Sequence, residues 1–528
     1  MSLYSIPVVN VKGNRELYGR VARATLVIMI LSLIDKMLAL AKEVSLAHQF
    51  GISAGLDVFN VAYALPGVTV LVFSGAFVSA FVPLYSDWQR RFSHERINSV
   101  TTSLFLIALA CSCLLALAGY FSSASLFPIL GYGFNPAQQQ IGVTLEKYLI
   151  FLVLVEGSGI ALAALLTAQT RFLTLYTAPI LINLALIAFI WFGQSLGVFC
   201  LVWGTLTGAL LKLLFLLGGA YRIGFRFSRP TPEKIELRLF AVMFLPLLGS
   251  ELIANSNILI DQMMATQLSS GSVSALRYAY RINDLPVQLV VLATSKALFP
   301  FISKMAVAED HAGLKHLFTQ SFVFIALITF PAICVFTVFS NEIVAIVLQR
   351  GSFGSAATAR TAGILFCYSL GLFFYSLSFV NAAFFAALRN PGPLFAMGAA
   401  TVILNVFLNL VFMRFLGTAG IALSSTVVLA VACAVLFALL RRRLQNGSFR
   451  GLPANLSRIA LAGLAMLVVI CLLRMLMRGY GHLVYVPVSA AAGFFAYVAV
   501  IWILRTEEIQ TCFQLIKSTL SPKSWTGS

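Results

Sequence analysis

Charged side chains are scarce in this sequence. Only 10% of the 528 residues are Asp, Glu, Lys or Arg, whereas 60% are hydrophobic. A soluble domain carries about 25% charged residues, so this chain could not cover itself with a polar surface in water. The same composition excludes disordered and fibrous chains. It indicates a polytopic membrane protein with almost no room for soluble domains.

Motifs of enzymes, metal centres and secretion are also missing. The eight cysteines fall mostly in apolar runs without CxxC or His-paired spacing, so we interpret them as small core residues. No HExxH, Walker A or DxD pattern occurs, and the five histidines are unclustered. The first 20 residues are polar and unlike a signal peptide. We therefore expect a protein that is not an enzyme and that holds no cofactor.

Fourteen apolar runs are long enough to cross a bilayer, which takes about 20 residues for each crossing. The runs are continuous and do not alternate with period two, which excludes a β-barrel and predicts helices. The predicted fold class is an all-α polytopic membrane protein. The predicted spans are 22–46, 58–85, 99–121, 146–168, 172–193, 196–219, 239–267, 275–303, 318–340, 358–387, 393–415, 418–440, 456–477 and 483–504.

Basic residues are unequally divided between the two sides of these spans. If the N-terminus is cytoplasmic, 24 Lys and Arg residues fall on the cytoplasmic side and six on the opposite side. This bias fixes orientation in membranes, and a miscounted span would have scrambled it. The net charge of +18 therefore indicates topology and not nucleic-acid binding. Both termini are predicted to be cytoplasmic.

A short motif occurs twice, as AFVPLYS at 80–86 and as ALFPFIS at 297–303. The copies lie six spans apart, so they have the same orientation. Parallel repeats predict two six-helix lobes related by a pseudo-two-fold axis along the membrane normal, with the substrate cavity between them. The predicted divisions are a cytoplasmic segment (1–21), an N-lobe (22–219), a basic linker (220–238), a C-lobe (239–440), a basic loop (441–455), two C-terminal spans (456–504) and a cytoplasmic tail (505–528).

Ionised residues concentrate in spans 1, 7 and 8. Each costs at least about 2.5 kcal/mol at the centre of a bilayer, so their clustering suggests a use. Arg277 and Arg281 are four residues apart and share a helix face, and Asp284 can pair with Arg281. Together with Lys36 and Lys42 of span 1, they could form a cationic chamber for a phosphate-bearing anion.

A simpler interpretation stays open for these charges. Three adjacent or near-adjacent pairs could be ion pairs that only neutralise each other: Asp35 with Lys36, Lys42 with Glu43, and Arg281 with Asp284.

Uncharged polar residues accompany one carboxylate in spans 7, 11 and 12. Asn405 and Asn409 share a helix face at i, i+4, Ser424 and Ser425 follow in span 12, and Asp261 lies in span 7. Carboxylate, amide and hydroxyl oxygens are plausible ligands of a hard cation. The same spacing is also typical of hydrogen bonds between membrane helices.

Further motifs run in order through residues 22–440. They are FG at 50–51 before Asp57, LP at 65–66, GAF at 75–77, GSVSAL at 271–276, LQRG at 348–351, YSLG at 368–371, FFA at 384–386, LN at 404–405 and 408–409, LG at 416–417 and AG at 419–420. Together they resemble the MurJ/MviN family, the lipid II flippases of the multidrug/oligosaccharidyl-lipid/polysaccharide exporter superfamily. The resemblance implies a fourteen-helix fold in which spans 13 and 14 form a groove for a polyprenyl tail.

The resemblance also implies site residues. The family's functional arginines of span 1 fall on Lys36 and Lys42, its span-8 arginine on Arg281 and its acidic position opening span 2 on Asp57. Its span-2 arginine has no counterpart, since Thr69, Val70 and Leu71 occupy that neighbourhood. A sodium site of some members falls on Asp261, Asn405, Asn409 and Ser425.

The expected function is translocation of an undecaprenyl-pyrophosphate-type glycan across the bacterial inner membrane by alternating access, driven by sodium or the membrane potential. Lipid II, a peptidoglycan precursor, is the first candidate cargo. The expected partners are this lipid-linked glycan and membrane lipid, and the chain is expected to be a monomer. The two lysines and the missing arginine leave an exopolysaccharide repeat unit as the alternative.

A drug or organic-cation exporter fits less well, because the charges in the spans are mainly positive. A glycan polymerase or ligase would need acidic residues in a large outer loop, and loop 122–145 has none.

Overall fold

The structure is a computed structural model that describes residues 11–229, 234–388, 390, 392–444, 451–477 and 479–504. The predicted cytoplasmic tail, 505–528, lies outside these residues. Every regular element within the described ranges is helical, which confirms the predicted fold class. Among the described cysteines, Cys200, Cys334, Cys367 and Cys433 are buried, as core residues should be.

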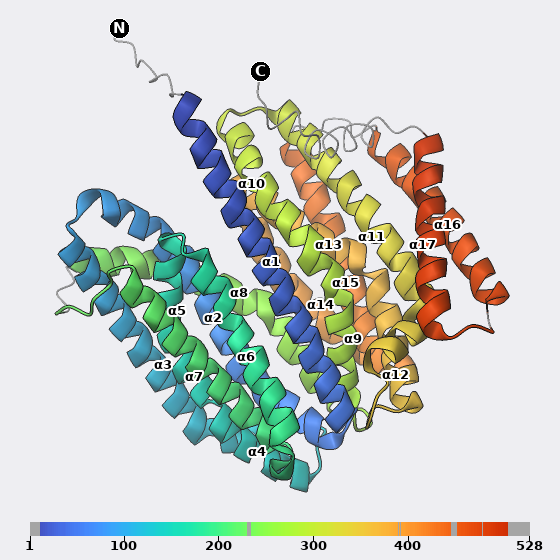
Figure 1. Cartoon of the computed structure of the whole chain (residues 1–528), viewed down its shortest axis with the longest axis horizontal. Helices are drawn as coiled ribbons and strands as arrows, with labels where there is room; N and C mark the ends of the chain where they lie inside the picture. Colours follow the sequence, from blue (N-terminus) through green and yellow to red (C-terminus); the bar gives the residue numbers. More distant parts are fainter. Residues whose placement is uncertain are drawn as a thin grey trace. The chain divides into compact units, whose positions relative to one another are not determined.

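The predicted spans correspond to single helices or to pairs of consecutive helices (Figure 1). The first seven correspond to α1 (Val11–Phe50), α2 (Ala54–Arg91), α3 (His94–Leu130), α4 with α5 (Pro136–Leu149, Phe151–Ala168), α6 (Phe172–Phe192), α7 (Phe199–Arg222) and α8 (Lys234–Ala265). The others correspond to α9 with α10 (Ser272–Pro286, Leu292–Val307), α11 (His311–Leu348), α12 with α13 (Ser355–Leu370, Leu372–Ala387), α14 (Gly392–Leu416), α15 (Thr418–Arg443), α16 (Gly451–Leu476) and α17 (His482–Ile503).

Eleven stretches of the described chain are long and apolar enough to cross a membrane, or up to twelve if the bent pair α12 and α13 forms one span. The count of fourteen therefore stays a prediction. Predicted span 8 is divided, because a π-helical turn, Val287–Val291, follows Pro286 and separates α9 from α10. The two pieces have only 15 and 16 residues. A π-turn of this kind is frequent at functional sites.

The chain forms two compact units. Unit 1 comprises residues 1–46, 62–128 and 139–252. Within it α7 packs against α5 and α6. Aromatic rings of α2, including Phe73, Phe77 and Phe81, stack along the helix and meet Phe240 and Phe244 of α8. These side chains form one of the continuous cores of the protein.

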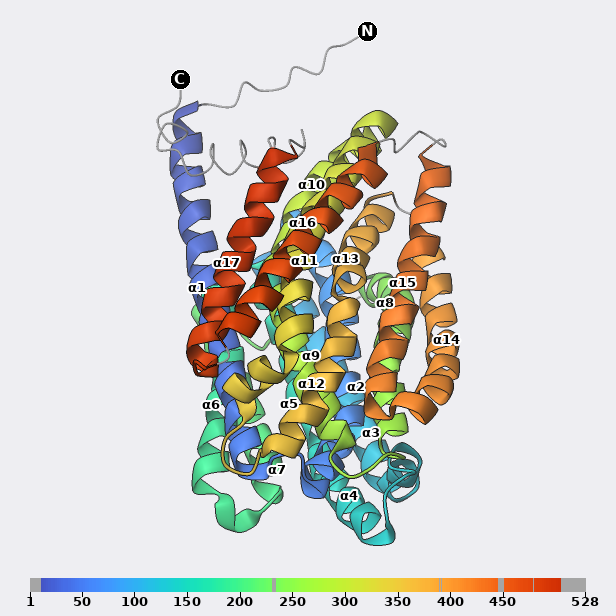
Figure 2. The same cartoon turned by 90° about the vertical axis from the view of Figure 1, so that its right-hand side faces the viewer.

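Unit 2 comprises residues 47–61, 129–138 and 253–528. Its core surrounds α11, which packs against α12, α13, α16 and α17. Phe318 and Phe322 of α11 contact Phe384 and Phe373 of α13 edge to face. Figure 2 shows the hairpin of α16 and α17 beside α11.

The division between the units differs from the predicted linker 220–238. It falls inside α8, between Leu252 and Ile253, and the start of α2 is assigned to unit 2. The start of α2 belongs there because Asp57 and Asn60 bond to α9. Hydropathy could not predict this, since it registers where a helix is apolar and not which helix it contacts.

Candidate functional site

The polar helix α9 carries three of the predicted substrate-binding residues, Arg277, Arg281 and Asp284. It begins after Gly271, whose φ of +86° lies in the left-handed region that favours glycine. A Cβ at this position would lie 2.6 Å from the carbonyl oxygen of Ile52. Both the backbone conformation and the close approach therefore require glycine at the start of α9.

Asp57 caps the start of α9. Its Oδ2 accepts a hydrogen bond from the Gly271 amide at 2.6 Å, and its Oδ1 accepts from the amide and the hydroxyl of Ser274 at 2.7 and 2.6 Å. Asp57 is 2% exposed. Such a bond satisfies helix-end amides that have no partner within the helix. In this conformation Asp57 positions α9, and its predicted contact with substrate stays a prediction.

The two arginines of α9 lie one turn apart. Arg277 donates from Nη1 to Oδ1 of Asn60 at 2.5 Å, and Asn60 Nδ2 donates to the Ser274 hydroxyl at 3.3 Å. Arg277 is half-buried, whereas Arg281 is exposed. Asp57 of α2 thus holds the start of α9, and Asn60 of α2 holds Arg277.

Asp284 lies buried at the other end of α9, beside two half-buried tyrosines. It accepts hydrogen bonds from Gln288 Nε2 at 3.0 Å and from the Tyr375 hydroxyl at 3.2 Å. The Tyr375 hydroxyl is 3.1 Å from that of Tyr280. These contacts join α9 to α13, and the predicted pairing of Asp284 with Arg281 stays a prediction.

Arg360 of α12 was not predicted as a site residue, yet it holds the loop that precedes α9. It donates to the carbonyl oxygens of Ser269 and Ser270 at 3.0 and 2.7 Å and to the hydroxyl of Ser272. Asp57 and Arg360 therefore both fix this loop. No local pattern could identify Arg360, because its partners lie about 90 residues away in the sequence.

The predicted cations of α1 are each paired with a neighbouring acid. Lys36 Nζ lies 3.6 Å from Asp35, and Lys42 Nζ lies 3.1 Å from Glu43. Asp35 also accepts a hydrogen bond from Asn183 of α6 at 3.1 Å. Both predicted ion pairs are therefore present in this conformation. Their role as substrate ligands stays a prediction.

The structure brings together all four residues of the predicted cation site. Asn409 Nδ2 donates to Asp261 Oδ1 at 2.8 Å and to Asn405 Oδ1 at 2.9 Å. The Ser425 hydroxyl donates to Asp261 Oδ2 at 3.0 Å, and the Ser424 hydroxyl donates to Asn409 Oδ1. Asn405 and Asn409 are buried. These side chains join α8, α14 and α15 through a single polar network.

This network fits a small hard cation. Its members offer carboxylate, amide and hydroxyl oxygens, which are the ligands that such cations prefer. The Asn409 amide group lies between Asp261 and Asn405, and a half-turn of that group would place its oxygen there in place of its nitrogen. The residues present therefore match the sodium ion that the family resemblance implies.

Comparison with known proteins finds relatives that share one description. The family model described as lipid II flippase MurJ matches residues 46–491. The probable lipid II flippase MurJ of Rhizobium meliloti (strain 1021) is 29% identical over 452 residues, covering 82% of this chain and 83% of that protein. The lipid II flippase MurJ of Burkholderia cenocepacia is 25% identical over 434 residues, covering 80% and 84%.

Solved structures share the fold. One described as lipid II flippase MurJ in an inward closed conformation has a TM-score of 0.79 at 21% identity, covering 90% of this chain and 98% of that one. An inward-facing multidrug resistance MATE family transporter has a TM-score of 0.68 at 14% identity, covering 80% and 98%. The resemblance found in the sequence motifs is thus confirmed, and because the family model matches most of its length, the chain belongs to the lipid II flippase MurJ family.

Proposed function

We propose that this chain is a flippase that moves lipid II across the bacterial inner membrane by alternating access, without catalysing a reaction. The observation that carries this proposal is the family match over residues 46–491. The relatives named above are lipid II flippases, or probable ones, so the exopolysaccharide alternative is not favoured. The likeness to a multidrug transporter concerns the fold alone.

The chemistry of α9 supports an anionic cargo. A pyrophosphate group cannot cross hydrocarbon unaided, because removing its charge from water costs far more than thermal energy supplies. The Arg281 side chain is exposed. Arg277 lies one turn away on α9 and donates a hydrogen bond to Asn60. A guanidinium presents N–H donors in a planar fork that matches phosphate oxygens. We assign the first contact with the pyrophosphate to Arg281.

Lys36 and Lys42 are proposed to contribute after a change of partner. Each ammonium now contacts a carboxylate next to it on α1. A pyrophosphate carries more charge than one carboxylate and could displace it, leaving the lysine as a point charge on the cargo. The pairs would also offset the charges of these two lysines while no cargo is bound.

Orientation, tail binding and oligomeric state belong to the same proposal. The bias in basic residues supports cytoplasmic termini. The hairpin of α16 and α17 is proposed to hold the polyprenyl tail in the bilayer while the headgroup crosses. The protein is proposed to work as a monomer.

Complementation tests the cargo directly. Expression of this chain in a strain depleted of its own lipid II flippase should restore growth and cell shape. Failure of a protein that inserts normally into the membrane would contradict lipid II as the cargo. Membrane insertion is checked by fractionation and by protease accessibility of tagged termini.

We also propose that Asp261, Asn405, Asn409 and Ser425 hold a sodium ion. When bound, the ion would offset the charge of the Asp261 carboxylate inside unit 2. The four residues hold it with side-chain oxygens from α8, α14 and α15.

Sodium should therefore stabilise the purified protein more than potassium does. An ion that binds only the folded state at one hundred times its Kd adds about 2.7 kcal/mol of stability. Thermal unfolding is measured in matched NaCl and KCl, for the unaltered chain and for Asp261→Asn. The difference between the salts should vanish in the variant. Equal stability of the unaltered chain in both salts would rule out a selective sodium site.

A further inference from the structure

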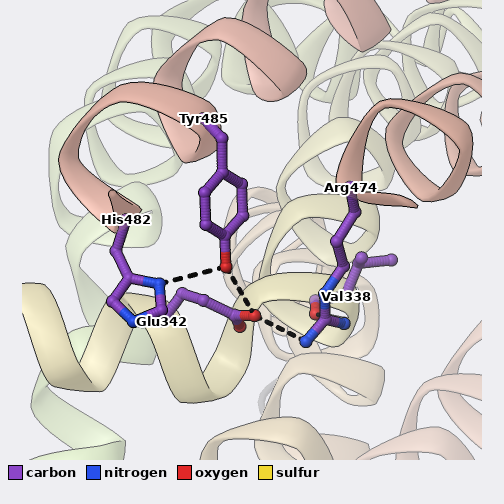
Figure 3. A network of polar contacts seen from close by, with 5 residues as sticks. All are labelled: Val338, Glu342, Arg474, His482 and Tyr485. Atoms are coloured by element: carbon purple, nitrogen blue, oxygen red, sulfur yellow. Dashed lines mark hydrogen bonds and ion pairs between the residues drawn. The ribbon is translucent and has the colours of Figure 1, made fainter. Parts of the chain in front are cut away.

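A second polar network joins the ends of α11, α16 and α17 within unit 2 (Figure 3). Arg474 Nη2 donates to Glu342 Oε1 at 2.5 Å, and the Tyr485 hydroxyl donates to the same oxygen at 3.0 Å. His482 Nδ1 lies 3.1 Å from the Tyr485 hydroxyl. Three helices thus meet at one carboxylate, and neither α9 nor the Asp261 network includes any of these residues.

A kink in α11 helps to fix Arg474. Phe339 has non-helical backbone angles, and the carbonyl oxygen of Val338 accepts a hydrogen bond from Arg474 Nη1 at 2.8 Å. Helices kink where a side chain inserts into the backbone hydrogen-bond ladder. A guanidinium has five N–H donors, so these two bonds leave others for a ligand.

A pocket of about 400 Å³ opens at this network, and Glu342, Arg474, His482 and Tyr485 line it. Its volume lies within the range of sites for small ligands and headgroups. Glu342 is 4% exposed, and its second oxygen, Oε2, is buried without a hydrogen-bond partner among the described residues. A buried carboxylate oxygen without a donor is costly, so a small shift of the Glu342 side chain that brings Oε2 to the pocket favours a ligand with an N–H donor.

The surroundings of the pocket are apolar and exposed. Met475 lines it at 65% exposure, and Leu476 and Leu483 beside it are 70% and 74% exposed. Apolar side chains that are this exposed in a membrane-spanning chain face lipid tails. Tyr480 also lines the pocket, and exposed tyrosines are typical of the headgroup level. A ligand with acyl chains therefore matches this position better than a soluble ion.

We propose that this pocket binds the headgroup of a zwitterionic phospholipid with a primary ammonium, as in phosphatidylethanolamine. The ammonium donates to Oε2 of Glu342, and the phosphate accepts from the remaining N–H groups of Arg474. The acyl chains lie along the exposed apolar side chains of α16 and α17.

The charges of the pocket distinguish this headgroup from others. Glu342 and Arg474 form an ion pair of no net charge, which a zwitterion complements at both ends. An anionic headgroup without an ammonium would leave Oε2 without a donor. A trimethylammonium headgroup is also zwitterionic, but it has no N–H to donate.

Lipid competition tests the proposal on the full chain. The purified protein is equilibrated with equal amounts of phosphatidylethanolamine, phosphatidylcholine and phosphatidylglycerol of identical acyl chains, and native mass spectrometry measures the lipid retained. We expect phosphatidylethanolamine to be retained at least about tenfold over phosphatidylcholine, a ratio that one charge-assisted hydrogen bond supports. Equal retention of the two lipids would overturn the proposal.

Variants separate the two ends of the headgroup. Glu342→Gln should bring the ratio close to one, whereas Arg474→Lys should weaken retention of all three lipids and leave the ratio unchanged. The matched control is Glu156→Gln, which alters a comparably short ion pair, to Lys212 at 2.6 Å, in unit 1 and should keep the tenfold ratio. A Glu342→Gln protein that keeps the ratio would contradict the ammonium contact.

Two further measurements keep the test decisive. If Glu342→Gln fails to fold, as thermal unfolding would show, the ratio for the unaltered chain and for Arg474→Lys decides the matter. Soluble phosphoethanolamine and inorganic phosphate are tested in parallel. Stabilisation by either one as strong as that by the lipid would overturn the assignment to a lipid.

Discussion

Replacing Arg281 by alanine should abolish lipid II translocation while leaving membrane insertion normal. This side chain is exposed on α9, and two charge-assisted hydrogen bonds to a pyrophosphate would account for at least about a hundredfold in rate. Arg281→Lys should retain part of the activity, because it keeps the charge and loses the planar fork. The measurements are complementation of a flippase-depleted strain and transport of labelled lipid II in proteoliposomes.

The control for this prediction is Arg222→Ala, which removes an exposed arginine at the end of α7 and should leave transport unchanged. Full complementation by Arg281→Ala at a normal membrane level would contradict the assigned role. A loss shared by Arg281→Ala and Arg222→Ala would show only that basic charge matters for orientation.

Asp57→Ala should destabilise the protein more than any other substitution proposed above. It leaves three donors at the start of α9 without their acceptor, namely the Gly271 amide and the Ser274 amide and hydroxyl. Each buried donor that loses its partner costs about 1–3 kcal/mol. We therefore expect at least about 3 kcal/mol of destabilisation, measured by thermal unfolding in detergent. Asp57→Asn keeps one acceptor oxygen, so its stability should fall between those of Asp57→Ala and the unaltered chain.

Asp87→Ala provides the matched control for Asp57, since it removes an exposed acid from the same helix. Asp87 contacts only Arg91 at 3.8 Å among the ion pairs of the described residues, with 59% of its side chain exposed. An exposed pair contributes about 0–1 kcal/mol, so this variant should unfold almost as the unaltered chain does. If Asp57→Ala were no less stable than Asp87→Ala, the capping role would be wrong.

The predicted spans are shorter than the helices that contain them. The run 58–85 lies inside α2, which extends from Ala54 to Arg91, and the run 22–46 lies inside α1, Val11–Phe50. Hydropathy registers only the part of a helix that matches the bilayer, whereas backbone hydrogen bonds continue into polar sequence. The bend of 45° between α12 and α13 and the π-turn after α9 were also not predicted.

The contacts of the polar residues could be predicted within one helix but not between distant segments. Asn405 and Asn409 were expected on one helix face, and they do form one network with Asp261 and Ser425. The expected contact of Asp57 with substrate stays a prediction, and the structure adds that both of its oxygens bond to the start of α9. Spacing within one helix is a local property that the sequence specifies. Contact between segments 214 residues apart depends on how the helices pack.

Composition alone determined that this is a helical membrane protein, because a chain with 10% charged residues cannot remain in water and a lipid-exposed backbone must bond within its own helix. Local motifs determined its family. Only the tertiary structure decided that Arg360 holds the loop before α9 and that Glu342 meets Arg474 and Tyr485 beside a pocket. The reason is that the sequence separation between hydrogen-bond partners on different helices follows no regular repeat, so no local pattern reveals them.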